Sequence, residues 1–556
     1  LDVDGGTIKL DGNYPTGTDN VALGDTALDS VEAGGSSNTA IGHNAGTAIT
    51  TGDGNTAVGD LALDANTTSH DNVAIGRCAL TTNITGANNT AVGSYALRDS
   101  TGSDNVAVGQ GSALKTTGGC NVSVGSNSLK CNVGGSNNTA VGFESLRCNT
   151  TGASNSAFGF SALKLNETGA SNIAMGVNSM LANTTGGSNS ALGNNTLQYN
   201  TTGACNTALG RCSLFCNTSA DNNTAIGFCS LRSNTTGACN TAVGSCALNA
   251  NTTASANTAV GTLVLAANTT GTANTAIGKS ALYYNTTGSC NMAFGGAALL
   301  NNTEGLDNIA MGLVSLCCNT TGDNNVAIGS CALRANTTAS NNTAVGYAAL
   351  KANTTGAHNT AVGATSMSSN TTGCQNVAMG RNSLCTNTTG FCNTALGYNS
   401  LVSNTTGCCN IAVGRSALNA NTTASNNTAV GTNSLLANTT GGNNVAIGYS
   451  SLCTNISGNA NTAVGLEALR DNTASNNTAM GQTAMLLNTS GSSNAAFGFD
   501  ALKFNTTGGN HTAIGKCALS LNTTASNNTA VGSESLAKNT TGGANTAVGA
   551  LALDSN

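Results

Sequence analysis

Apolar and polar side chains follow one another along this chain in a pattern that repeats every 17 residues. The pattern is clearest over residues 342–346, which read Asn-Thr-Ala-Val-Gly, and over residues 359–363, which read the same. Thirty-two copies begin between Asn20 and Asn545, and their consensus continues as x-x-Ala-Leu-x-x-Asn-Thr-Thr-Gly-x-x. Positions are numbered here from the first Asn of each copy. Self-similarity at a fixed period is typical of solenoids and related repeat folds.

The residues of the repeat predict short strands joined by turns. Gly stands at position five in all 32 copies, and Asn, Gly and β-branched residues fill much of the remainder, which opposes helix and favours strand and turn. Seventeen residues are also too few for a helix-turn-helix repeat. We therefore predict an all-β fold, a β-solenoid of the β-helix or β-roll type. It would have about 32 coils, each stacked on the next at about 4.8 Å.

The repeat also sets the expected domain organisation. Residues 1–19 are predicted to form a degenerate opening coil, and residues 20–556 a continuous solenoid. The spacing lengthens to 18 once and shortens to 16 three times, and surface turns are expected to absorb these changes. Because the last copy stops after twelve residues, we expect the chain to be a fragment or a processed piece of a longer protein.

Two positions are predicted to fill the core, namely position four, as at Val345, and position nine, as at Leu350. If position four points inward, positions three and five share the opposite face of the strand. The Gly residues at position five, such as Gly346, Gly363 and Gly380, then have two interpretations. They are needed for backbone geometry at a corner, or they form with Ala a flat strip on which a second copy packs.

Asparagine recurs at positions one and twelve, for example at Asn342 and Asn353. Asn side chains suit turns, and equivalent amides in stacked strands can bond to one another. The sequence therefore predicts two Asn ladders that run through the coils.

Charge excludes several partners. Only 8% of residues are charged and the net charge is −6. The basic residues fall almost entirely at positions six, ten and eleven, which are expected to face water. The sequence has no basic patch with interleaved aromatic residues, so we expect no nucleic-acid partner. No apolar run approaches the roughly 20 residues of a membrane helix, so we expect no membrane insertion.

The chain has 21 cysteines, and three of them, Cys212, Cys229 and Cys246, occupy position seven of successive coils. They are expected to stack about 4.8 Å apart, as inter-coil disulfides or as free thiols. The four histidines do not cluster with cysteines, so no metal site is expected. Without a recognisable catalytic motif, we expect no catalytic residues, no cofactor and no enzymatic activity.

The Asn-Thr-Ala-Val-Gly and Asn-Thr-Thr-Gly phrases resemble the repeat arrays of phage and virus tail-fibre proteins. They are also similar to the head repeats of trimeric autotransporter adhesins, which share the Ala-(Ile/Val)-Gly phrase. Residues 6–15 look like the segment that leads into such arrays in phage fibres. The resemblance implies a homotrimeric or filamentous fibre on a virion or at an extracellular cell surface.

From this resemblance we expect a structural shaft that extends an attachment device. Its partners would be further copies of the chain, as a homotrimer or head-to-tail filament, and a host surface reached through a domain outside this sequence. The alternative is an adhesin or other surface-binding solenoid that recognises a host, a carbohydrate or ice.

Overall fold

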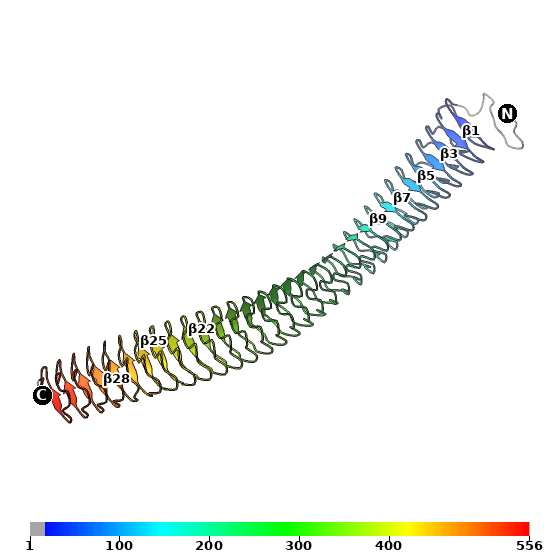
Figure 1. The fold of residues 1–556 in the computed structure, drawn as a ribbon. Helices are drawn as coiled ribbons and strands as arrows, with labels where there is room; N and C mark the ends of the chain where they lie inside the picture. Colours follow the sequence, from blue (N-terminus) through cyan, green and yellow to red (C-terminus); the bar gives the residue numbers. More distant parts are fainter. Residues whose placement is uncertain (1–16, 555–556) are drawn as a thin grey trace. The chain divides into compact units, whose positions relative to one another are not determined.

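The computed structural model describes residues 17–554 and confirms the predicted fold class, an all-β parallel solenoid of about 31 turns with 17-residue spacing. Each coil contributes one three-residue strand to a parallel sheet (Figure 1), and no helix occurs among residues 17–554. The chain divides into two compact units, residues 1–275 and 276–556, which are built from the same coil. The opening coil expected over residues 1–19 lies outside the described residues except for its last three.

The strands of the first unit are β1 Val21–Leu23, β2 Thr39–Ile41, β3 Thr56–Val58, β4 Val73–Ile75, β5 Thr90–Val92, β6 Val106–Val108, β7 Val122–Val124, β8 Thr139–Val141, β9 Ser156–Phe158, β10 Ile173–Met175, β11 Ser190–Leu192, β12 Thr207–Leu209, β13 Thr224–Ile226, β14 Thr241–Val243 and β15 Thr258–Val260. Strand β16, Thr275–Ile277, begins at the last residue of that unit.

The strands of the second unit are β17 Met292–Phe294, β18 Ile309–Met311, β19 Val326–Ile328, β20 Thr343–Val345, β21 Thr360–Val362, β22 Val377–Met379, β23 Thr394–Leu396, β24 Ile411–Val413, β25 Thr428–Val430, β26 Val445–Ile447, β27 Thr462–Val464, β28 Thr478–Met480, β29 Ala495–Phe497, β30 Thr512–Ile514, β31 Thr529–Val531 and β32 Thr546–Val548.

Neighbouring coils are hydrogen-bonded around their whole circumference. Strands β20 and β21 pair in parallel with Ala344 opposite Ala361, so equivalent positions stack directly. Outside the strand, the N–H of Leu350 donates to the Ser366 carbonyl at 3.0 Å, and the N–H of Thr354 donates to the Thr371 carbonyl at 2.9 Å. Backbone polar groups must be paired when they are buried, and here the next coil supplies most of the partners.

The core is narrower than the sequence pattern predicts. Ala344, Ala349 and Leu350, at positions three, eight and nine, are all 0% exposed, which agrees with the expectation for position nine. The expectation for position four is wrong, because Val345 is only half-buried and lies on the outer side of the strand. Ala344 therefore points inward, and the predicted outer strip of Ala and Gly does not form.

The reason lies in how a 17-residue coil closes. In most coils three non-glycine residues have left-handed backbone conformations, as at Ala348, Leu350 and His358 with φ of 54°, 50° and 58°. Such conformations cost about 1–2 kcal/mol per residue, but they turn the chain sharply within few residues. The resulting interior holds one large side chain per coil, which is the Leu, and the alanines fit beside it.

One coil shows how the core is filled when the repeat varies. Gly46 replaces the usual Leu, and Ile49 replaces the usual Asn three residues later. Ile49 is 1% exposed, and its Cδ1 lies 3.0 Å from where a Cβ on Gly46 would be. The side chain of Ile49 thus occupies the space that Leu fills elsewhere.

Candidate functional site

The two predicted Asn ladders are both present. The backbone N–H of Asn342 donates to the Oδ1 of Asn325 at 3.0 Å, and its Nδ2 donates to the Gly356 carbonyl at 2.9 Å. In the second ladder, the Nδ2 of Asn353 donates to the Oδ1 of Asn336 at 3.0 Å and also to the Gly356 carbonyl at 2.9 Å. One carbonyl at position fifteen therefore joins the two ladders. Because these amides are fully buried, their hydrogen bonds fix the register of the stack.

The shortened coils interrupt only the second ladder. The coil that begins at Asn461 is one residue shorter in its Asn-Thr-Thr-Gly turn. The Oδ1 of Asn455, in the coil before it, has no hydrogen-bond partner. The Oγ of Ser100, which takes the Asn position in another short coil, is unpaired too. The first ladder continues, with the N–H of Asn477 donating to the Oδ1 of Asn461 at 3.0 Å. The length changes thus fall in the turn, as expected.

The glycines at position five are required by the backbone. Gly346, Gly363 and Gly380 have φ of 131°, 128° and 131°, which only glycine adopts readily. A Cβ on Gly346 would lie 2.7 Å from the carbonyl carbon and oxygen of Gly363 in the next coil. The corner-geometry interpretation of these glycines is therefore the correct one.

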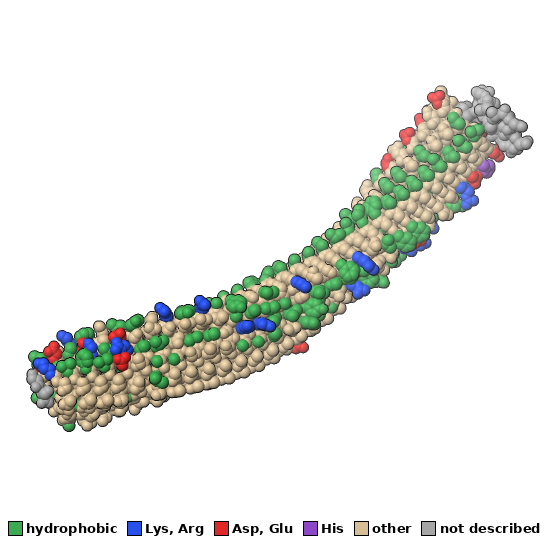
Figure 2. Space-filling view, in the orientation of Figure 1, with side chains coloured by type: hydrophobic (Ala, Val, Ile, Leu, Met, Phe, Trp, Pro, Cys, Tyr) green, Lys and Arg blue, Asp and Glu red, His purple; other side chains and the backbone are tan. Residues whose placement is uncertain are grey.

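The outer side of the strands forms an uncharged surface, called here the sheet face and defined by positions two and four. Position four is apolar in all 32 strands, and position two is Thr, Ser, Ala or an aliphatic residue, with no charged side chain at either position. Met379 is 46% exposed and Ile447 is 40% exposed. Figure 2 shows rows of hydrophobic side chains that follow the stacked coils.

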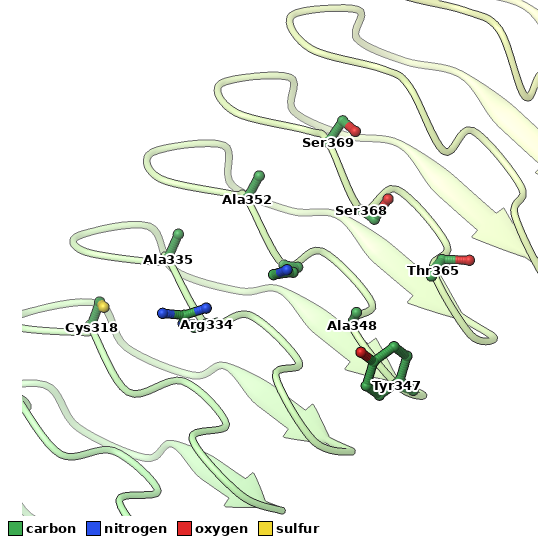
Figure 3. A pocket seen from close by; sticks show the side chains of 10 residues that line it. Cys318, Arg334, Ala335, Tyr347, Ala348, Ala352, Thr365, Ser368 and Ser369 are labelled. Atoms are coloured by element: carbon green, nitrogen blue, oxygen red, sulfur yellow. The ribbon is translucent and has the colours of Figure 1, made fainter.

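A second surface, called here the turn face, consists of positions six, seven, ten and eleven. In the second unit it contains an open hollow of about 700 Å³ (Figure 3). Tyr347 and Arg334 lie on neighbouring coils at its sides, and Lys351 adds a second cation. The remaining lining residues are small or carry hydroxyl or thiol groups, namely Cys318, Ala335, Ala348, Ala352, Thr365, Ser368 and Ser369. No carboxylate lines this hollow.

The predicted cysteine stack lies on the turn face of the first unit. Cys212, Cys229 and Cys246 are half-buried free thiols, and they line a hollow of about 410 Å³ together with Arg211, Phe228, Arg232 and Asn249. Burial raises the pKa of the Cys229 thiol, and the two neighbouring thiols raise it further. The thiolate is the reactive form of cysteine, so this environment lowers the reactivity of Cys229.

His511 replaces Asn in the first ladder and preserves its hydrogen bonds. Its N–H donates to the Oδ1 of Asn494 at 2.9 Å, and its Nδ1 accepts the N–H of Asn528 at 3.2 Å. Its Nε2 lies 2.6 Å from the Ala525 carbonyl. Burial lowers the pKa of His511, so the ring is held neutral within the stack.

Other kinds of site are not found in the part of the chain that the structure describes. No group of three or more His, Cys, Asp or Glu side chains within residues 17–554 could hold a metal ion. The same residues form no helix that is long and apolar enough to cross a membrane.

No protein-family model matches this chain, and a search of curated proteins also finds no match. Its function is therefore inferred from the surfaces described above.

The sheet face was not expected, because a two-residue alternation does not say which set of residues points inward. Positions six, ten and eleven of the turn face were expected to face water, but no binding role was expected for them, because the residues that meet on this face are 17 residues apart in the sequence.

Proposed function

We propose that this chain is the shaft of a fibre on a virion or cell surface, and that copies of the chain pack on one another through the sheet face. The coils suit a mechanical role, because backbone hydrogen bonds and two buried Asn ladders connect each coil to the next. Pulling such a stack apart requires breaking many hydrogen bonds in each coil.

The observation that carries the proposal is the uncharged sheet face. Soluble monomers seldom expose a contiguous apolar patch larger than a few hundred Å². Here no strand carries a charge at positions two or four. A second copy presents the same apolar residues at the same spacing, so the face is complementary to itself.

The composition of position four favours a protein partner over ice. Side chains of very different size follow one another there, as at Val141, Phe158 and Met175 of three successive coils. Protein interfaces accommodate such variation by interdigitation, whereas a surface that matches a crystal lattice needs a regular array. The three-fold assembly of the fibres that the repeat resembles is one arrangement that covers this face.

The mass of the chain in solution tests the proposal. We expect light scattering to give a multiple of 54.3 kDa, with a value three times as large for a trimer. A double variant of the sheet face, Val362→Lys with Met379→Lys, should reduce the mass to that of a single chain, since a buried unpaired charge is costly.

The matched control is Thr355→Lys with Thr372→Lys, which places two charges in an exposed column away from the sheet face. It should leave the mass unchanged. A single-chain mass for the unmodified protein at micromolar concentration would refute the proposal, and so would equal effects of the two double variants.

A further inference from the structure

One segment of the turn face carries positive charge only. Between Asn324 and Leu466 the sequence contains four Lys or Arg residues and no Asp or Glu. All four are exposed and stand at position six or ten, and they are Arg334, Lys351, Arg381 and Arg415. Stacking therefore brings the four charges onto one side of the second unit.

These cations have no anionic partner among residues 17–554. Nine ion pairs occur in the described residues, and none of them involves residues 324–466. In the coils that follow, cations at the same position are paired, as Arg470 is with Asp471 at 2.9 Å and Lys503 with Asp500 at 3.1 Å. The turn face thus has a segment whose cations are free to bind an external anion.

Exposed aromatic rings lie among these cations, so the premise that the chain has no basic patch with interleaved aromatic residues is wrong for this segment of stacked coils. Tyr347 is 61% exposed and Tyr398 is 45% exposed, both at position six. Arg381, Tyr398 and Arg415 hold position six in three successive coils, so a ring stands between two guanidinium groups. At the other end of the segment, Tyr347 borders the hollow in Figure 3. The hydroxyls of Thr365 and Ser368 in this hollow already bond to Asn382 and Cys385 but can still accept a hydrogen bond, and Ser369 adds a third hydroxyl.

The first unit repeats this combination independently. Its hollow is lined by Arg211 and Arg232 with the exposed ring of Phe228. The acidic residue nearest in sequence, Asp221, accepts the N–H of Ala204 at 2.7 Å and does not line the hollow. Two cations beside an exposed ring, without a carboxylate, are therefore a recurrent arrangement on the turn face.

We propose that the turn face of residues 325–466 binds an acidic polysaccharide in which charged and neutral sugars alternate. Carboxylates of the polymer pair with Arg334, Lys351 and the arginines of the position-six column. Tyr347 and Tyr398 pack against sugar rings, and the serine and threonine hydroxyls of the hollow bond to sugar hydroxyls. The polymer lies along the direction in which the coils stack.

The spacing of the charges favours this ligand over a nucleic acid. Lys351, Arg381 and Arg415 lie in every second coil. With about 4.8 Å per coil, successive cations are therefore about 10 Å apart along the direction in which the coils stack. A nucleic-acid strand carries a phosphate about every 3.4 Å, so most phosphates along this face would have no cation. A polymer with one carboxylate on every second sugar has a lower charge density, closer to that of the face.

The test uses the full chain and hyaluronan, which carries one carboxylate per disaccharide, with neutral dextran and oligothymidylate for comparison. We expect binding to hyaluronan and none to dextran. The triple variant Arg334→Gln, Lys351→Gln, Arg381→Gln should weaken hyaluronan binding at least tenfold. The control triple variant Arg470→Gln, Lys503→Gln, Lys516→Gln removes the same charge from cations that have carboxylate partners, and it should change the affinity less than twofold. Circular dichroism confirms that each variant is folded.

Three outcomes would overturn the proposal. These are no binding of the unmodified chain to hyaluronan, equal weakening by the two triple variants, and tighter binding to oligothymidylate than to hyaluronan. The last outcome would assign the face to nucleic acid. None of these results depends on self-association, because the turn face and the sheet face have no position in common.

Discussion

Two glycines of one coil, Gly363 and Gly373, should respond very differently to the same substitution by alanine. Gly363 has φ of 128°, and a Cβ there would lie 2.7 Å from the carbonyl carbon and oxygen of Gly380. Those atoms belong to the backbone of the next coil. Because the N–H of Gly380 donates to the Val362 carbonyl at 2.8 Å, they cannot move away alone. Backbone strain of about 1–3 kcal/mol and overpacking of about 1–3 kcal/mol predict a loss of about 2–6 kcal/mol for Gly363→Ala.

For Gly373, the repeat itself shows that alanine is accepted. A Cβ there would lie 2.4 Å from the Oδ1 of Asn370 and from the Gly390 carbonyl oxygen, which suggests an equal clash. Yet six coils carry Ala at this position, always next to a coil that carries Gly, namely those of Ala220, Ala254, Ala339, Ala424, Ala474 and Ala525. Gly373→Ala should lower the stability of its coil by about 1 kcal/mol. The main reason is the loss of the hydrogen bond that the Gly373 N–H donates to the Thr388 carbonyl.

Hydrogen exchange read by mass spectrometry over residues 325–409, which span five successive coils with Gly363 in the middle one, is the suitable assay. A repeat array unfolds in parts, so a single melting temperature would not isolate one coil. Gly363→Ala should abolish slow exchange in its own coil and the two adjacent coils, and leave coils further away unchanged. Gly373→Ala should leave slow exchange largely intact. Equal loss of protection in both variants would refute the account of the position-five corner.

Three further predictions concern single side chains. Leu350 is fully buried, so Leu350→Ala should destabilise its coil by about 2–5 kcal/mol. Val345 is only half-buried, so Val345→Thr should destabilise a single chain by less than about 1 kcal/mol. Hydrogen exchange can compare the two variants. Val314 is β-branched at φ of 50°, so Val314→Asn should stabilise its coil by up to about 1 kcal/mol, seen as slower exchange. Burial lowers the pKa of His511 in the folded chain. The stabilising contribution of the neutral ring is therefore complete above the unfolded-state pKa of about 6.5, and it is lost as the pH falls below that value. His511→Asn should remove this acid sensitivity, which hydrogen exchange at two pH values can measure.

The fold was predictable because one short phrase is repeated so often. The repeat predicts the coil, its length and both ladders. The prediction rests on the invariant Gly at position five, the Asn at positions one and twelve, and the Leu at position nine. The ladders followed from chemistry alone, since a buried Asn needs partners and a stack offers the same Asn one coil away. Asn342 and Asn353 make these bonds.

The direction of the strand was not predictable in the same way. Ala344 and Val345 alternate, and period two allows either set to face inward. The usual preference for burying the larger residue selects Val345, and it fails because Leu350 already fills the interior of so short a coil. The left-handed residues at positions seven and nine make the coil turn sharply, so little space remains inside it beside the Leu side chain. No residue preference predicts these conformations.

The error matters for function, because it exchanges the inner and outer faces of the sheet. With Ala inside, every strand presents an uncharged, mainly apolar pair of side chains to its surroundings, whereas charge varies freely on the turn face. A surface that need only remain soluble has no reason to exclude charge from positions two and four of every strand. A surface that must be covered by another protein does, since one unpaired charge buried there would cost several kcal/mol. The absence of charge therefore points to a constraint from outside the coil, and this supports the proposed packing of copies of the chain through the sheet face.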